Sequence, residues 1–358
     1  MGVVAYTFKR TFCLKTFSTL SASFSCWLMR IVHYHIIIVI SKFMSVKSIF
    51  SKTALLKLAI ILPSFILLTV SCSNDDNDNG GSGKEEINLN KNEITTDNAV
   101  TRLEFPRLKG GNSIVLIYRT KGDKQYDKDE INYCVEWDCS KKSQRWSCYQ
   151  MHQGYTGNYS RVTDSYHNDT SLDSEYYWAE DYYYGSGYEH GHICPNADRK
   201  FSYDANYQTF YMTNMQPQYH KFNGYTNSGQ DQGEGLWVRM EDQVRSWTPR
   251  AKTDTLYVCK GGTIDNEDQI ISRIQGKLIV PKYFFMACLL KNSEGYRAIG
   301  FWAEQKKDEW RTDDPLSLYA VTIDQLEELT GIDFFCNLPD DTENKVESSI
   351  AIKAWGLK

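Results

Sequence analysis

Two histidines and a cysteine stand close together in the segment GYEHGHICPNADR, residues 187–199. His190 and His192 are one residue apart, so their side chains would share one face of a β-strand. With Glu189 and Cys194 nearby, this spacing is compatible with a zinc site. A neutral imidazole can also act as a general base, or can simply hydrogen-bond to the backbone at the end of a strand. The segment by itself leaves these interpretations open.

Neutral amides are frequent in the segment that follows the histidines. Its polar residues include, in chain order, Asn214, Gln218, Asn223, Glu241 and Arg245. Glu241 and Arg245 are four residues apart on a predicted helix, where side chains at this spacing are neighbours. An ion pair on the helix surface is one interpretation of these two residues. Amides beside a carboxylate and a guanidinium also suit a phosphate and a hydrated hard cation, and they suit these ligands better than zinc.

The order of these residues resembles the signature of the DNA/RNA non-specific endonuclease family, the ββα-metal nucleases. That signature is Asp-Arg-Gly-His, then Thr/Ser-Asn-x-x-Pro-Gln, then an asparagine and Trp-x-x-x-Glu-x-x-x-Arg. The corresponding pieces follow one another here in the same order: Glu189–His192, Thr213–Gln218, Asn223, and Trp237 with Glu241 and Arg245. The similarity extends over roughly residues 130–340. Each piece alone is a weak signal, whereas the ordered set is specific.

By position, the resemblance implies a general base and a metal centre. His192 corresponds to the base that takes a proton from water. Asn223 corresponds to the single direct protein ligand of a magnesium ion, for which manganese could substitute. Glu241 corresponds to a residue that contacts the ion through bound water, and Asn214 to a supporting position near the base.

The resemblance also implies contacts with the nucleic acid. Arg161 lies 31 residues before His192, where the family has an arginine that contacts phosphate. A solvated surface charge is the alternative interpretation of Arg161, because the surrounding loop is polar. Arg245 is implied to approach the phosphate and to stabilise the extra charge of the transition state. Gln218 and Glu189 are implied to bind substrate.

One motif departs from the family pattern, because Glu189-His190 stands where the family has Asp-Arg. The carboxylate is retained with one more methylene, while the guanidinium is lost. An imidazole cannot make the bidentate phosphate contact of an arginine. We therefore expect His190 to be structural or to contact substrate more weakly.

Hydrophobic patterns indicate an α+β protein, and the resemblance implies the ββα-metal nuclease fold on a mostly antiparallel sheet flanked by helices. Strands are predicted over residues 113–120, 131–138, 144–152, 255–261, 277–290 and 296–304. A helix is predicted over residues 236–247, where apolar residues recur at helical spacing. A second helix is predicted after Thr322, which with Gln325 forms a capping box, and Gly331 is expected to end it.

These observations predict a magnesium-dependent endonuclease that hydrolyses DNA and RNA without sequence preference, since none of the expected site residues reads a base edge. The net charge of -5 and pI of about 5.9 argue against a protein that coats nucleic acid. Two alternatives remain. One is a degenerate nucleic-acid-binding protein, which the presence of both His192 and Asn223 disfavours, and the other is a zinc hydrolase that uses His190, His192 and Cys194. No obligate protein partner is evident.

The N-terminal part has the pattern of an export signal. Residues 44–72 combine lysines, the apolar run LAIILPSFILLTV and a final Cys72, which resembles a bacterial lipoprotein signal whose cysteine is lipidated. A cleaved secreted protein and an uncleaved anchor are the alternatives. Residues 1–43 are expected to be an upstream extension with a start codon assigned too early, so that translation begins at Met44.

The remaining boundaries follow from composition. Residues 73–100 open with SNDDNDNGGSG, a polar and glycine-rich run that predicts a flexible tether and resembles the surface-export signals of some Bacteroidetes lipoproteins. Residues 101–358 are expected to form the endonuclease domain. The predicted location is the outer membrane, with the protein anchored through Cys72 and facing the periplasm or the cell exterior.

Seven cysteines follow Cys72, and they include no C-x-x-C pair, so a zinc ribbon is not indicated: Cys134, Cys139, Cys148, Cys194, Cys259, Cys288 and Cys336. An exported protein can form disulfides, and an odd number leaves at least one thiol free. Cys139 and Cys148 flank a predicted turn and are one candidate pair.

Overall fold

The computed structural model describes residues 86–94, 97–120, 130–155, 157–162, 166–226 and 232–358. The expected extension, the export signal with Cys72, and the first part of the tether lie outside these residues. The described residues belong to one compact unit, Gly83–Lys358. Within them, none of the helices combines the length and the apolar character that a membrane span requires.

A seven-stranded sheet forms the centre of this unit, with the order β1-β2-β3-β8-β11-β12-β13 and every neighbouring pair antiparallel. Its strands are β1 (Ser113–Arg119), β2 (Ile131–Asp138), β3 (Ser143–Met151), β8 (Thr255–Gly262), β11 (Tyr283–Asn292), β12 (Gly295–Glu304) and β13 (Ala320–Val321). The strand β8 pairs with β3 on one side and β11 on the other, so the two halves of the chain meet there. The expected α+β class is confirmed.

The central strands are buried on both faces, and successive side chains enter two different hydrophobic cores. Val258 and Cys288 belong to the first core, whereas their chain neighbours Cys259 and Ala287 belong to the second. This division follows from the two-residue period of a strand. It explains why these segments are almost continuously apolar instead of alternating with polar residues.

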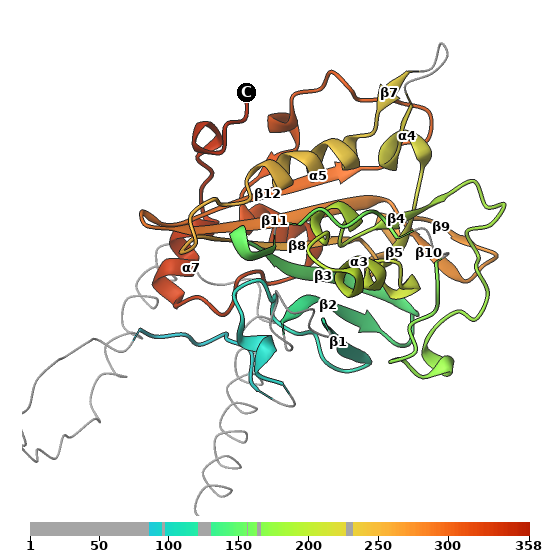
Figure 1. The fold of residues 1–358 in the computed structure, drawn as a ribbon, viewed down its shortest axis with the longest axis horizontal. Coiled ribbons are helices and arrows are strands. Elements are labelled where there is room, and N and C mark those ends of the chain that lie inside the picture. The colour runs from blue at the N-terminus through green and yellow to red at the C-terminus, as the bar shows by residue number, and fades with distance from the viewer. Residues whose placement is uncertain (1–85, 95–96, 121–129, 156, 163–165, 227–231) are drawn as a thin grey trace, which may run out of the picture. The chain divides into compact units, whose positions relative to one another are not determined.

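Helices cover each face of the sheet (Figure 1). They are α3 (Tyr203–Gln208), α4 (His220–Asn223), α5 (Leu236–Ser246), α6 (Ile323–Thr330) and α7 (Asp340–Glu347). The apolar side of α5, with Met240 and Val244, packs into the first core, whereas Leu326 of α6 and Val346 of α7 pack into the second. The predicted capping box at Thr322 is present, and α6 ends at Gly331, whose φ of 68° favours glycine.

Smaller elements complete the unit. Three two-stranded sheets are formed by β4 (Glu189–His192) with β5 (Met215–Gln218), β6 (Tyr225–Thr226) with β7 (Gly233–Glu234), and β9 (Ile270–Ile274) with β10 (Leu278–Pro281). Short 3-10 helices span Asn98–Thr101, Gln153–Tyr155, Ser174–Tyr176, Asn196–Asp198, Met212–Asn214, Glu267–Gln269, Leu316–Tyr319 and Ile352–Trp355. The single strand predicted over residues 277–290 is wrong in one respect, since it is divided between β10 and β11. Pro281 lies at the division, where its missing N–H prevents a continuous ladder.

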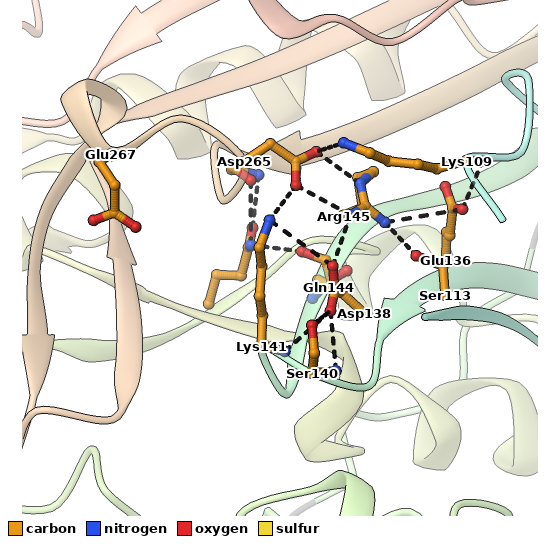
Figure 2. A network of polar contacts seen from close by, with 12 residues as sticks. Lys109, Ser113, Glu136, Asp138, Ser140, Lys141, Gln144, Arg145, Asp265 and Glu267 are labelled. Carbon is orange, nitrogen blue, oxygen red and sulfur yellow. Dashed lines mark hydrogen bonds and ion pairs between the residues drawn. The ribbon is translucent and has the colours of Figure 1, made fainter. Parts of the chain in front are cut away.

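A polar network ties the turn between β2 and β3 to the loop that follows β8 (Figure 2). Buried Arg145 of β3 donates from Nε to Asp265 at 2.8 Å and from Nη2 to Asp138 at 2.9 Å. Lys109 and Lys141 also contact Asp265. Hydrogen bonds from these three cations lower the pKa of Asp265 against the opposing effect of burial. The network therefore fixes the ends of β3 and β8, two strands that also contribute side chains to the site described below.

The N-terminal boundary of the compact unit differs from the one expected at residue 101. Asn88 donates through its side-chain amide to the carbonyl of Cys336, and Asn92 donates to the carbonyls of Val100 and Pro106. Asn92 is buried. The segment before residue 101 thus belongs to the compact unit, because Asn88 satisfies a carbonyl near the C-terminus and Asn92 satisfies two carbonyls close to it in the chain.

All seven cysteines of this unit are free thiols. The candidate disulfide between Cys139 and Cys148 is therefore not formed. Cys148 instead lies opposite Cys134 on β2 and Cys259 on β8, and all three are buried in the second core. Burial raises the pKa of Cys148 and Cys259, so these thiols stay protonated and act as small apolar core residues.

Candidate active site

The strand pair β4–β5 and the following helix α4 form a ββα unit that carries the two central residues expected at the site. Glu189 pairs with Gln218, and His192 with Met215, in an antiparallel register. Strand geometry places His190 and His192 on one face of β4 and Glu189 on the other. The helix α4 begins directly after β5 and ends with Asn223.

Gly191 is required by the packing of β4 on β5. A Cβ atom at this position would lie 2.3 Å from the side chain of Gln218. Gln218 is completely buried, and neither polar atom of its side chain has a hydrogen-bond partner in the segments that the structure describes. The structure therefore places Gln218 beneath β4, and it does not bring the expected substrate contact of this residue to an open surface.

Glu189 holds the amide of Asn223 in one orientation. Asn223 donates from Nδ2 to Glu189 Oε2 at 2.9 Å, and the Nδ1 atom of His220 hydrogen-bonds with Glu189 Oε1 at 2.5 Å. The amide nitrogen is turned toward the carboxylate, so the amide oxygen is the atom that can ligate a hard cation. Glu189, expected to bind substrate, is in this geometry a positioning residue for Asn223.

His192 is partly buried and has an imidazole nitrogen with an unused lone pair. Within the described part of the chain its Nε2 atom lacks a hydrogen-bond partner, and its ring meets the ring of Phe210 edge-on at 5.3 Å between centroids. Burial, together with the positive charge of Arg161, lowers the pKa of His192 to about 3. The ring is thus neutral at ordinary pH, which is the form that can accept a proton, while its low pKa makes it a weaker base than a solvated histidine.

Arg161 and the expected base His192 both contact the ring of Phe210. Its guanidinium is 4.8 Å from the centroid of the Phe210 ring, and the residue is exposed. Because its charge acts on the pKa of His192, the two residues are electrostatic neighbours. The structure therefore brings Arg161 to the site, as expected, although it lies in a segment without regular secondary structure.

His190 is held between two aromatic rings. Its ring stacks on Tyr166 at 3.8 Å and on Tyr183 at 4.2 Å between centroids, and its Nε2 atom lies 3.1 Å from both carboxylate oxygens of Asp181. Burial lowers its pKa, against the opposing charge of Asp181. These contacts support the expectation that His190 has a structural role.

A zinc site at His190, His192 and Cys194 is not favoured by this arrangement. Among the described residues, the one cluster of His, Cys, Asp and Glu side chains with metal-ligand spacing lies elsewhere, on α6 and α7. Burial raises the pKa of Cys194 to about 12, which disfavours the thiolate that zinc requires.

Asn214 supports the backbone at the end of β4 through hydrogen bonds of its side-chain amide. Its Oδ1 atom accepts from the backbone N–H of Cys194 at 2.8 Å, and its Nδ2 atom donates to the carbonyls of Cys194 and Thr209, each at 2.9 Å. Ser147 of β3 donates to the same Oδ1 atom at 3.3 Å. The residue is fully buried. It therefore acts on His192 through the backbone of β4, without facing the site itself.

Glu241 and Arg245 of α5 do not pair with each other. Glu241 Oε1 accepts from the Nζ atom of Lys260 at 2.7 Å, and Arg245 donates from Nε to buried Asp198 at 2.6 Å. Burial raises the pKa of Glu241, and the charge of Lys260 opposes this. Instead of the ion pair considered for the helix surface, Glu241 pairs with Lys260, and Arg245 pairs with Asp198 and with Asp242 of the same helix.

Sequence reasoning missed Lys260. Its side chain is 1% exposed, and its Nζ atom lies 4.6 Å from the ring centroid of Trp237. A buried lysine is rare unless it is paired. The available signal was a lysine inside the apolar run TLYVCKG, because a charge within a buried strand must have a partner.

Residues 112–341 match the model of the DNA/RNA non-specific endonuclease family. A nuclease from Nostoc sp. is 28% identical over 233 residues, which cover 61% of this chain and 76% of that protein. The mitochondrial endonuclease G of Bos taurus is 25% identical over 222 residues, covering 59% and 69%. A chain in the crystal structure of the EndoG/EndoGI complex has a TM-score of 0.47 and 20% identity, covering 57% of this chain and 84% of that chain.

The substitution Asn214→Ala tests whether the hydrogen bonds of the Asn214 side chain stabilise the fold. It removes hydrogen bonds to three backbone groups in the interior, so we expect the free energy of unfolding to fall by on the order of 3 kcal/mol. Asn223→Ala, the matched control, removes one part-buried hydrogen bond and should cost about 1 kcal/mol or less. Urea unfolding followed by circular dichroism measures both. Equal destabilisation by the two substitutions would contradict the structural role of Asn214.

Proposed function

The chain belongs to the DNA/RNA non-specific endonuclease family of hydrolases, and on this premise we propose that it cleaves DNA and RNA without sequence preference by a magnesium-dependent reaction. The observation that carries the proposal is the state of two side chains. His192 is a neutral imidazole with an unpartnered Nε2 atom, and the amide oxygen of Asn223 is left available by the contact with Glu189.

In the proposed reaction, His192 removes a proton from the water that attacks the phosphorus atom. A neutral imidazole is the form that can accept this proton, and burial keeps His192 in that form. Asn223 fits a hard cation, since a carboxamide oxygen is a ligand that magnesium accepts together with several waters. When bound, magnesium, or manganese in its place, would neutralise charge on the phosphate and the leaving 3′ oxygen.

Three further residues support this chemistry in the proposal. Arg161 is exposed beside the base, so its guanidinium can meet a phosphate without first breaking a buried ion pair. Arg245 is anchored by Asp198 and has other N–H donors, so it is assigned to the phosphate as well. Glu241 uses one oxygen for Lys260, and its second oxygen is assigned to a metal-bound water.

Metal dependence separates the proposal from its alternatives. Magnesium-supported cleavage of a plasmid favours the nuclease. Cleavage that occurs only with zinc favours a zinc hydrolase. Absence of cleavage with every metal favours a degenerate nucleic-acid-binding protein. The buried thiol of Cys194 and the presence of both His192 and Asn223 argue for the first outcome.

Substitutions at the proposed base and at the proposed metal ligand should change the cleavage reaction in different ways. His192→Ala is expected to lower the cleavage rate by about 10²-fold or more without changing magnesium affinity, because it removes the proton acceptor alone. Asn223→Ala should raise the magnesium concentration needed for half-maximal rate, and added magnesium should restore part of the rate. His190→Ala is the control and should cost less than His192→Ala. A dead His190→Ala beside a nearly active His192→Ala would show that the motif assignment is wrong.

The pH dependence of cleavage tests the charge around His192. Because the folded-state pKa lies well below the ordinary value of 6.5, the neutral base persists far into acid and the rate should not fall near pH 6.5. Arg161→Ala removes a charge that lowers this pKa, so the decline of the cleavage rate in acid should begin at a higher pH. Arg161→Lys keeps the charge and should leave the pH of this decline unchanged. Cleavage rates measured from pH 8 down through the decline expected near pH 3 test this, and an identical decline in the two variants would refute the coupling.

We further propose that the protein is an outer-membrane lipoprotein anchored through Cys72, with the nuclease domain facing the periplasm or the cell exterior. The support is the apolar run before Cys72 and the polar segment after it. The wild type should partition into the detergent phase, whereas Cys72→Ala should lose the lipid and move toward the aqueous phase. If both forms partition equally into water, the lipid anchor is excluded.

A further inference from the structure

Three carboxylates converge between α6 and α7, outside the site described above. Asp324 and Glu327 are three residues apart on α6, and Glu347 is the last residue of α7. Each offers one carboxylate oxygen, and the three oxygens lie within 4.8 Å of one another. In Figure 1, α7 lies at the left of the molecule, whereas α4 and β4 lie at the right.

Glu347 is the central observation. It is 6% exposed, and its Oε1 atom has no hydrogen-bond partner among the residues that the structure describes. A buried carboxylate without a partner is costly, because burial removes its hydration. Its place at the carboxyl end of α7 adds to this cost, since the helix dipole is negative there. An unpartnered acid in this position needs either a proton or a cation.

The protein supplies no compensating charge among the strongest influences on Glu347. After burial, these influences are the carboxylates of Glu327, Glu343, Asp333 and Asp324, and all of them raise its pKa. Asn90 donates to Glu343 and Asp333, so these two acids already have a polar partner. The three converging carboxylates are therefore the ones left to share a ligand.

We propose that Asp324, Glu327 and Glu347 bind a calcium ion that links α6 to α7. Carboxylate oxygens are hard ligands, and two oxygens bound to one calcium ion can be about 5 Å apart. Magnesium demands near-octahedral geometry and dehydrates reluctantly, so it is held by a cage of protein carboxylates less readily than calcium is. Glu327 keeps its contact with the backbone N–H of Phe334 through Oε1, which leaves its second oxygen for the ion. Water would complete the coordination, because Asp324 is exposed.

Thermal unfolding of the full chain, first in EDTA and then with calcium, tests this site. Millimolar calcium should raise the Tm of the wild type by about 5 °C. The matched control Asn223→Ala, which alters the nuclease site alone, should respond like the wild type. Glu347→Gln should lose the response, and its Tm in EDTA should equal or exceed that of the wild type because the buried charge is gone.

A second variant tests the site independently in case Glu347→Gln does not fold. Asp324→Asn changes an exposed side chain and should raise the calcium concentration needed for half of the Tm shift. The proposal is overturned if calcium leaves the wild-type Tm unchanged, or if Glu347→Gln and Asp324→Asn respond like the wild type. An equal response to magnesium at the same concentrations would overturn the assignment to calcium.

Discussion

The hydrogen bond from Asn223 to Glu189 is the contact on which the geometry of the site depends. Glu189 is on β4 and Asn223 ends α4, so this bond fixes the helix to the strand that also carries His192. A free carboxamide can rotate and present either its nitrogen or its oxygen to a cation. The carboxylate selects one orientation, because it can accept a hydrogen bond from nitrogen alone. The proposed proton acceptor His192 and the proposed metal ligand Asn223 are thereby held on one unit.

Around this unit, some charged side chains form buried ion pairs, whereas Arg161 is exposed. Lys260 of β8 and Glu241 of α5 form a buried pair, and Arg245 of α5 is held by Asp198. Such pairs are costly to break, because the remaining charge stays buried without a partner. The first pair fixes α5 to the sheet, and the second fixes it to the 3-10 helix Asn196–Asp198. Arg161 is instead exposed beside a ring, so it can exchange water for a phosphate at lower cost. An acidic chain can thus present local positive charge where substrate binds.

Local patterns in the sequence predicted the elements, whereas contacts between distant segments decided the rest. Strands and helix α5 follow from residue periodicity, and the motif order identified His192 and Asn223. Periodicity contains no information on which strands pair, so the position of β8 between β3 and β11 could not be predicted. Lys260 was missed for the same reason, since its partner Glu241 comes from another element. Glu347 has no motif, and its neighbours on α6 are found only in the fold.

The exchange of the family's arginine for His190 shows how the surroundings of a motif change its chemistry. An arginine there would place a permanent charge next to His192, whereas burial between Tyr166 and Tyr183 favours a neutral imidazole. The position therefore contributes no fixed charge for a phosphate. In the proposed reaction, the negative charge of the phosphate is instead stabilised by Arg161 and by the cation that Asn223 would hold. Because Arg161 also lowers the pKa of His192, the residue that would attract the substrate is the one that keeps the base neutral.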